Sequence, residues 1–237
     1  MNLFPSGVFL GNGKLIVIEG TDGSGKGTQS KQLLHRFEEK GVLTAYVDFP
    51  RYGEKSAGMV ENYLNGKYGS AGEVDPKVAS MFYALDRYDA SFDIRKALGE
   101  GRIIVSNRYV SANMGHQAGK IKDPIKRKDF LEWLEELEYN FFKIPKPNLT
   151  ILLFVPYVVA QKLVENKGHR EYIGEKKKDI HEDDKQHLLD AEQAYLEVAK
   201  SKGWAIIDCT KGDKILSIDE IHEKVWSVVN NFLKSNP

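Results

Sequence analysis

A glycine-rich segment directly after a short apolar run constrains the fold of this chain more than any other part of it. Residues 15–18 are apolar and mostly β-branched, and the segment GTDGSGKGT follows them at 20–28. A strand, a glycine-rich turn and a helix start together form a phosphate-binding loop, because the backbone N–H groups converge there and the helix dipole adds positive potential. Gly20, Gly25 and Lys26 meet the G-x4-G-K spacing, and the lysine supplies a mobile charge for phosphate oxygens. We therefore predict that this segment binds the phosphate groups of a ligand.

The residue after the lysine is Gly27, where such loops usually carry a Ser or Thr whose hydroxyl binds Mg²⁺. A Mg²⁺ site at this loop would therefore lack its usual hydroxyl ligand. The prediction of phosphate binding is unaffected, because it depends on backbone groups. An ordinary glycine turn is the alternative, and the lysine in its strand–turn–helix context argues against it. The residues expected to bind the nucleotide are Gly20, Gly23, Ser24, Gly25, Lys26, Gly27 and Thr28.

Composition limits the classes of partner. The chain has 237 residues, enough for one large domain, and equal numbers of basic and acidic residues, 34 each. A net charge of zero gives no global basic field, so we expect no nucleic-acid or membrane partner. A single cysteine, Cys209, and the lack of any long apolar stretch favour a reducing, cytoplasmic location. Residues 1–13 are expected to form a short tail, since one proline, three glycines and the lack of a basic start make a poor signal peptide.

Short apolar segments alternate with helical patterns along the chain. The predicted strands are residues 14–19, 44–49, 102–107, 149–155 and 204–209. The predicted helices are residues 26–40, 56–64, 76–98, 124–142, 156–166, 180–201 and 219–233. This alternation indicates an α/β fold, and nearly continuous apolar strands indicate a mainly parallel sheet covered on both faces. Asp75 before Pro76 and Asp123 before Pro124 are expected to cap the helices that follow them.

One polar stretch stands out between the last two predicted helices before the final strand. Residues 166–179 have the sequence NKGHREYIGEKKKD, which includes Arg170 and the run 176–178 of three lysines. A solvated loop is one interpretation, and a basic lid that closes over phosphates is the other. With no repeat and no convincing linker, we predict a single domain over residues 14–237 with a lid at about 167–179.

Two arginines follow predicted strands. Arg51 comes just after the second strand and Arg108 just after the third. Ligands of open parallel sheets bind outside the carboxyl ends of the strands, so both are expected to face the same crevice as the phosphate loop. Arginine forks bind phosphate bidentately, and two of them would hold a phosphate acceptor in line with ATP.

Two further pairs occur at a spacing of four residues. Tyr83 and Arg87 share one helix face, as do Asn113 and Gln117. An aromatic ring with a neighbouring cation suits a nucleobase, and side-chain amides suit the edge of a pyrimidine. Core packing with a surface ion pair explains the first pair equally simply, and a polar helix face explains the second.

Together, these segments resemble the thymidylate kinase family of nucleoside monophosphate kinases. The resemblance covers residues 14–209 and rests on EGTDGSGKGTQ at 19–29, DFPRYG at 48–53, FYALDR at 82–87, NRYVSANMGHQAGK at 107–120, PKPNL at 145–149 and DIHE at 179–182. It implies a three-layer P-loop kinase fold with a five-stranded parallel sheet and a short lid. It also implies phosphate transfer from ATP to dTMP with Mg²⁺, in a homodimer.

The resemblance assigns roles by position. The catalytic set it implies is Asp22, Lys26, Arg51, Arg108 and Arg170, with Asp22 also organising the metal. The implied acceptor-binding set is Asp22, Arg51, Tyr52, Tyr83, Arg87, Arg108, Asn113, Gln117 and Glu182, with Asp179 near the sugar.

Four positions depart from the family pattern. Asn107 stands in place of an Asp and Gly27 in place of a Ser or Thr, which implies that Mg²⁺ is held mainly through water and ATP oxygens. Tyr83 replaces the usual Phe, and His116 stands where some relatives have Tyr, so selectivity for thymine and deoxyribose stays open. Because Gly23 follows Asp22 where one subgroup has an Arg, the catalytic cation is expected from the lid, with Arg170 the first candidate.

Two alternatives remain. One is a nucleoside monophosphate kinase with another or broader acceptor, such as dUMP or dGMP. The other is a weakly active P-loop relative or nucleotide-dependent switch, although the Asn-Lys-x-Asp and Asp-x-x-Gly elements of GTPase switches do not occur in the sequence.

Overall fold

The computed structural model describes residues 13–164 and 185–236, and within α6 (Tyr157–Val164) the side chains only as far as Ala160. Its centre is a five-stranded sheet with the strand order β2-β3-β1-β4-β5. All neighbouring pairs in this sheet are parallel. The strands are β1 (Lys14–Glu19), β2 (Thr44–Asp48), β3 (Ile103–Asn107), β4 (Leu149–Phe154) and β5 (Ala205–Asp208). The predicted α/β class and parallel sheet are confirmed.

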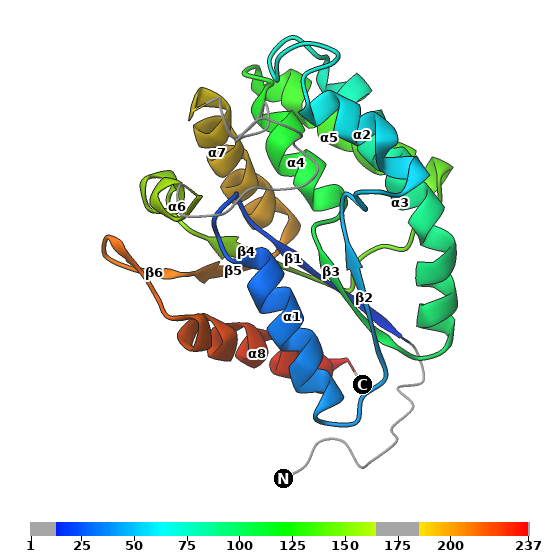
Figure 1. The fold of residues 1–237 in the computed structure, drawn as a ribbon, viewed down its shortest axis with the longest axis vertical. Coiled ribbons are helices and arrows are strands. Elements are labelled where there is room, and N and C mark those ends of the chain that lie inside the picture. The colour runs from blue at the N-terminus through cyan, green and yellow to red at the C-terminus, as the bar shows by residue number, and fades with distance from the viewer. Residues whose placement is uncertain (1–12, 165–184, 237) are drawn as a thin grey trace.

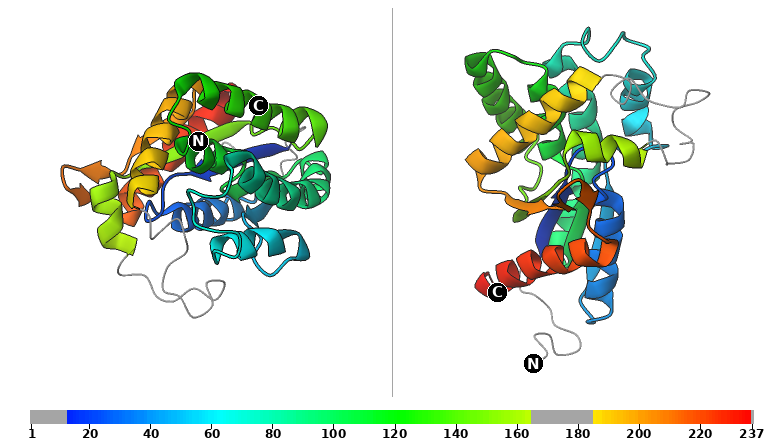
Figure 2. Two further views of the ribbon diagram at one scale, coloured as in Figure 1. Left: turned by 90° about the horizontal axis from the view of Figure 1, so that it is seen from above. Right: turned by 90° about the vertical axis from the view of Figure 1, so that its left-hand side faces the viewer.

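Helices cover both faces of this sheet, which gives three layers (Figures 1 and 2). On one face, α1 (Lys26–Glu38) and α8 (Ile218–Ser235) pack against each other and the strands. The helices with buried residues in the core of the other face are α3 (Pro76–Gly99), α4 (Val110–Gly119), α5 (Pro124–Glu135) and α7 (Lys185–Lys202). The remaining elements are the 3₁₀ turn Lys55–Ala57, α2 (Gly58–Leu64), the π-helical segment Glu136–Phe141, α6, and the hairpin of β6 (Thr210–Lys211) and β7 (Lys214–Ile215).

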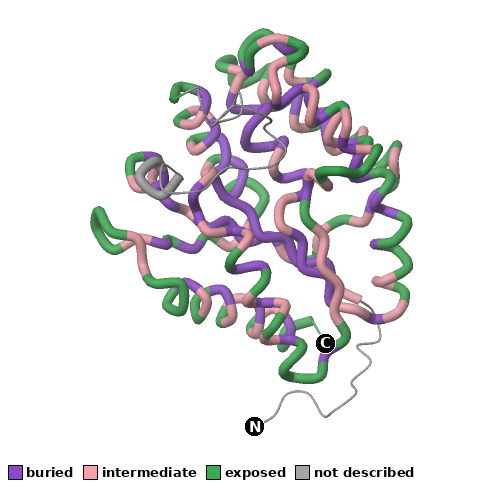
Figure 3. Tube along the Cα trace, viewed as in Figure 1, coloured by how far each residue is buried: buried purple, intermediate pink, exposed green. Residues whose placement is uncertain are grey.

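The central strands are buried on both sides, as Figure 3 shows for β1, β3 and β4. Successive side chains of a strand point to opposite faces. Accordingly, Ile16 and Ile18 belong to the core beneath α1 and α8, whereas Leu15 and Val17 belong to the core beneath α3, α4 and α5. This arrangement explains why the strand sequence is continuously apolar rather than alternating.

Several predicted boundaries shift by one or two residues, and two predictions are wrong in detail. The predicted helix 124–142 is α5 followed by a π-helical segment, within which the buried Glu138 accepts a hydrogen bond from Arg87. The hairpin at 210–215 was not predicted, since its strands have only two residues each. The caps at Asp75 and Asp123 are confirmed: each carboxylate accepts two backbone N–H bonds at the start of its helix.

Helices α4 and α7 pack closely against each other next to the carboxyl end of β1. A Cβ atom on Gly115 would lie 2.3 Å from the ring of Tyr195, so only glycine permits this approach. Tyr195 in turn donates a hydrogen bond of 3.0 Å to the buried Glu19 at the end of β1. The same carboxylate accepts hydrogen bonds from the Tyr109 backbone N–H and the Ser111 hydroxyl. Glu19 thereby ties the strand that leads into the glycine-rich loop to both helices.

Candidate active site

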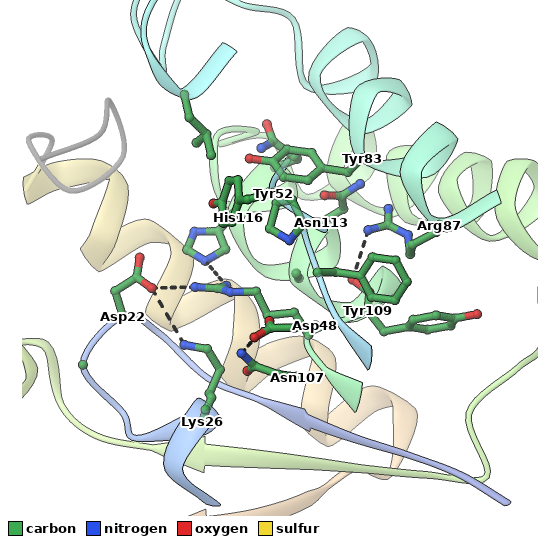
Figure 4. A pocket seen from close by; sticks show the side chains of 18 of the residues that line it. Asp22, Lys26, Asp48, Tyr52, Tyr83, Arg87, Asn107, Tyr109, Asn113 and His116 are labelled. Carbon is green, nitrogen blue, oxygen red and sulfur yellow. Dashed lines mark hydrogen bonds and ion pairs between the residues drawn. The ribbon is translucent and has the colours of Figure 1, made fainter. Parts of the chain in front are cut away.

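A cavity of about 410 Å³ lies at the carboxyl ends of β1, β2 and β3, where the predicted crevice was expected. Figure 4 shows Asp22 and Lys26 on one side of it and Tyr83, Asn113 and Arg87 on another. The predicted site residues that line it are Asp22, Gly23, Gly25, Lys26, Gly27, Thr28, Tyr52, Tyr83, Arg87, Arg108, Asn113 and Gln117. One cavity therefore combines most of the residues predicted from separate segments.

The glycine-rich loop has the backbone shape of an anion site. Gly25 has a φ of 85° at the N-cap of α1, a left-handed conformation that suits glycine, and no side chain caps the helix. The first turn of α1 contains no acidic residue that would compete for its N–H groups and dipole. Lys26 Nζ donates to the Thr21 carbonyl at 2.8 Å and lies 3.8 Å from the Asp22 carboxylate. These groups can bind a polyphosphate.

Arg108 has a strained backbone conformation, and two side chains hold its guanidinium. Its φ is 66°, in the left-handed region that non-glycine residues rarely adopt and that costs on the order of 1–3 kcal/mol. Its guanidinium donates to Asp22 at 2.5 Å and to His116 Nε2 at 3.1 Å. Burial disfavours the charged guanidinium, but Asp22 together with Tyr195, Glu19 and Tyr52 outweighs it and raises the pKa of Arg108. A permanent cation is thereby fixed beside the phosphate loop.

His116 takes its character from the same contact. Burial, reinforced by the charge of Arg108, holds the pKa of His116 well below its usual range. The ring is neutral at pH 7, and because arginine has only donors, His116 Nε2 accepts the hydrogen bond. His116 therefore orients Arg108 without adding charge.

Buried polar groups form the wall made by α3 and α4. Arg87 is 1% exposed; its Nε lies 3.0 Å from Glu138, to which Nη2 also donates, and its Nη1 donates to the Tyr109 carbonyl at 3.3 Å. Burial opposes ionisation, yet the Glu138 charge raises the pKa of Arg87. Gln117 is 1% exposed, and its side-chain oxygen has no hydrogen-bond partner among the described residues. Such a wall presents a donor and an acceptor to a polar ring.

Two other polar members complete this wall. Asn113 donates a hydrogen bond from its amide nitrogen to the Ser80 carbonyl at 3.3 Å, and its side-chain oxygen takes no part in this bond. The Tyr83 ring packs edge-on against Tyr63 at a centroid distance of 6.2 Å. The predicted pairs Tyr83 with Arg87 and Asn113 with Gln117 thus face one cavity, rather than serving only as core or surface residues.

Among the predicted site arginines within the described residues, Arg51 lies outside this lining, whereas Arg87 and Arg108 belong to it. The Arg51 guanidinium donates to Asp86 at 2.9 Å, to Asp89 at 2.5 Å and to the Ser56 hydroxyl at 2.7 Å. Burial disfavours its charge, but these hydrogen bonds and carboxylates raise the pKa of Arg51. Its phosphate-binding role stays a prediction, and Gly20 and Ser24 also lie beside the cavity lining rather than in it.

Some predictions lie outside the described residues. These are the lid at 167–179, Arg170, the three lysines at 176–178, Asp179 and Glu182. Residues 1–12 of the predicted tail are outside as well. In the part of the chain that the structure describes, no helix has both the length and the apolar character needed to cross a membrane.

Three carboxylates that accept hydrogen bonds from residues of the site were not predicted from the sequence. Glu138 lies 51 positions from Arg87 and has no motif around it, so no local signal identifies the pair. Glu19 is visible only as the last residue of a predicted strand. Asp48 ends β2 as Asn107 ends β3, and this shared strand-end position is a signal that could have paired them.

Comparisons with known proteins agree with this geometry. The family model described as thymidylate kinase matches residues 18–225. The thymidylate kinase of Mycobacterium tuberculosis is 29% identical over 191 residues, covering 80% of this chain and 87% of the relative. A probable thymidylate kinase of Methanocaldococcus jannaschii is 28% identical over 221 residues, covering 91% and 95%. The solved thymidylate kinase of Candida albicans, 21% identical, superposes with a TM-score of 0.70 over 93% of this chain and 92% of that one, which shows the shared fold. The chain therefore belongs to the thymidylate kinase family.

Proposed function

We propose that this cavity transfers the γ-phosphoryl group of ATP to dTMP, giving ADP and dTDP. Family membership supports the reaction, and the observation that carries it is the convergence of three features in one cavity: the phosphate loop with Lys26, the fixed cation Arg108, and the polar wall around Arg87 and Gln117. A phosphate oxygen of the acceptor bonds to the γ-phosphorus while the bond to the leaving ADP oxygen breaks. The protein supplies alignment and charge neutralisation for this step.

The positions of the cations support this division of labour. Lys26 lies in the first turn of α1, where the loop would hold the ATP phosphates. Arg108 approaches Asp22 from the end of β3, so it can bind phosphate oxygens between donor and acceptor. Arg51 would join it on the acceptor phosphate after exchanging Asp89 for that phosphate, and Arg170 would complete the charge from the lid.

The residues present also fit Mg²⁺. Mg²⁺ usually keeps several waters and is bound by one or two carboxylates together with substrate phosphates. Within residues 13–164 and 185–236, no group of three or more His, Cys, Asp or Glu side chains could hold a metal ion by itself. Asp22, beside Lys26, would contribute a carboxylate, whereas Gly27 has no side-chain hydroxyl to offer the ion. When bound, Mg²⁺ neutralises charge that develops on the transferred group.

The polar wall matches the edge of thymine. Arg87 Nη groups are donors that would meet a base carbonyl oxygen, and the Gln117 oxygen would accept the ring N–H. Tyr83 offers an aromatic face, Asn113 a second amide, and Tyr52 a hydroxyl at the cavity mouth. Glu182 and Asp179 would contact the sugar from the end of the lid.

We also propose a homodimer built on α3. This helix exposes Val78, Met81, Leu85, Tyr88 and Phe92, which are 40–57% accessible and recur at alternating spacings of three and four residues. That spacing places them in one stripe, the pattern by which helices of two copies pack together. A Leu85→Asp variant that sediments as the wild-type species would contradict the interface.

We further propose that residues 14–237 form one cytoplasmic domain.

ADP release with Mg-ATP and a panel of acceptors tests the proposed reaction. We expect fast turnover with dTMP and slower turnover with dUMP, dGMP, the ribose form of TMP, and AMP. Comparable rates with several acceptors would replace dTMP by a broader acceptor class. ATP binding without turnover of any acceptor would refute the reaction and favour a nucleotide-binding role.

A further inference from the structure

One carboxylate of the cavity has no part in the function proposed so far. Asp48 is the last residue of β2 and Asn107 the last of β3, and the two are direct neighbours in the parallel ladder. Both line the cavity, next to Lys26, Gly27 and Arg108. Figure 4 shows their side chains joined at the floor of the site, beside Lys26.

The Asp48 carboxylate is oriented by two donors. Asn107 Nδ2 donates to its Oδ1 at 2.7 Å, and the Tyr46 hydroxyl donates to its Oδ2 at 3.1 Å. A carboxylate has about four lone-pair sites, so each oxygen keeps capacity for another partner. The Asn107 side-chain oxygen is buried and has no hydrogen-bond partner among the described residues. Two acceptors are therefore fixed side by side at the end of the sheet.

Charge balance makes this arrangement unfavourable for phosphates alone. Within the described lining, the cations Lys26 and Arg108 are balanced by the anions Asp22 and Asp48, while Arg87 is neutralised by Glu138 behind it. A polyphosphate on the loop would meet the Asp48 charge at close range, and repulsion between like charges is strong in a partly desolvated site. Burial already raises the pKa of Asp48, while hydrogen bonds from Tyr46 and Asn107 lower it. A divalent cation between carboxylate and phosphate would replace this repulsion by two attractions.

The surrounding space also suits a hydrated cation. A Cβ atom on Gly27 would lie 3.8 Å from Asn107 Nδ2, in ordinary contact, so the glycine leaves space for at least a methyl group between α1 and the Asp48–Asn107 pair. The cavity of about 410 Å³ that these residues line has room for Mg²⁺ with its water shell, which needs hard oxygen ligands around it. We propose that Asp48 binds the Mg²⁺ of the ATP complex, directly or through its water shell, and that the Asn107 amide positions Asp48 for this role.

This inference rests on the proposed function, because it assumes that the loop binds a nucleotide with its metal. Mn²⁺ serves as the probe, and electron paramagnetic resonance measures its affinity for the protein saturated with ADP. Asp48→Asn is expected to weaken Mn²⁺ binding by roughly 10- to 100-fold, the range seen when groups that organise a metal are removed. The exchange variant, Asp48→Asn with Asn107→Asp, moves the carboxylate across the ladder and is expected to recover most of the affinity.

Controls separate the possible outcomes. Asp208→Asn removes a carboxylate at the end of β5, outside the cavity lining, and is expected to bind Mn²⁺ as the wild type does. Wild-type affinity in Asp48→Asn would overturn the inference and leave the proposed function intact. Failure of the wild-type protein to bind Mn²⁺ with ADP would overturn both.

A second variant decides the matter if Asp48→Asn does not fold. Asn107→Asp places two carboxylates opposite each other, so the metal-free protein should have a lower Tm than the wild type. Mn²⁺ with ADP should then raise its Tm by more than it raises that of the wild type, because the ion relieves the repulsion. An equal or smaller rise would contradict a metal at this position.

Discussion

The two sides of the cavity are built in different ways. The phosphate side is one continuous segment, in which the left-handed Gly25 and the start of α1 create the site from backbone groups. The base side combines Arg87 from α3, Gln117 from α4 and Glu138 from the π-helical segment, which are distant in sequence. The proposed phosphate site thus depends on local backbone geometry, and the proposed base site on side chains that only the tertiary structure brings together.

The difference matters for how each side tolerates change. Substitutions other than proline leave the backbone N–H groups of the loop in place, so its most readily exchanged part is the charge of Lys26. On the base side, every contact depends on a side chain and on the partner that holds it. We therefore expect mutations of the phosphate side to affect turnover with little loss of stability, and mutations of the base side to affect stability and binding as well.

The largest effect on turnover is expected from Lys26→Ala. Removing a positioned cation from a site of charge development costs roughly 3 kcal/mol in transition-state stabilisation, or about a hundredfold in kcat/KM. Arg108→Ala should cause a loss of similar size, since Asp22 holds that cation in the same cavity. Steady-state kinetics with Mg-ATP and dTMP measure both variants, and their Tm should stay close to that of the wild type. Near-normal kinetics in either variant would refute its role.

The largest effect on stability, rather than on turnover, is expected from Glu138→Ala. Glu138 is completely buried, so its removal leaves Arg87 as an uncompensated charge, which costs roughly 3–5 kcal/mol. The free energy of unfolding, from urea denaturation, measures this loss.

The double variant Arg87→Met with Glu138→Leu separates stability from function. Replacing both charges by apolar groups of similar size is often neutral for stability. We expect the double variant to regain stability but to bind dTMP poorly, because the base-facing donor is gone. If it binds dTMP normally, Arg87 serves the fold and not the base.

A smaller and more selective effect is expected from Gln117→Leu. The substitution removes the buried acceptor assigned to the base N–H, which is worth on the order of 1–2 kcal/mol, or roughly tenfold in the KM for dTMP. The KM for ATP should not change, because the loop lies on the other side of the cavity. A parallel rise of both KM values would show that Gln117 shapes the cavity generally.

The same contrast explains which features could be predicted from sequence. The strands, helix caps and phosphate loop follow from short-range patterns, and the strand ends brought Arg108 correctly to the loop. Arg51, at the equivalent place after β2, instead pairs with Asp86 and Asp89, because two carboxylates on α3 lie within its reach. Glu138 escaped prediction because nothing in a helical segment reveals which residue, 51 positions away, will need its charge.

The smallest effect expected is on the pH dependence of stability, and it comes from His116. Burial and the Arg108 charge lower its pKa in the folded protein, so between that pKa and about 6.5, the ordinary value, the unfolded chain binds a proton that the folded chain does not. The contribution of His116 to the free energy of unfolding is therefore fully present above about pH 6.5. It decreases as the pH drops below that value, by at most about 1.4 kcal/mol per pH unit for one proton. Because His222 also has a lowered pKa, the measurement is the difference between wild type and His116→Gln in urea denaturation from pH 5 to 8. The variant should show the shallower slope, and equal slopes would mean that the Arg108–His116 contact does not keep the imidazole neutral.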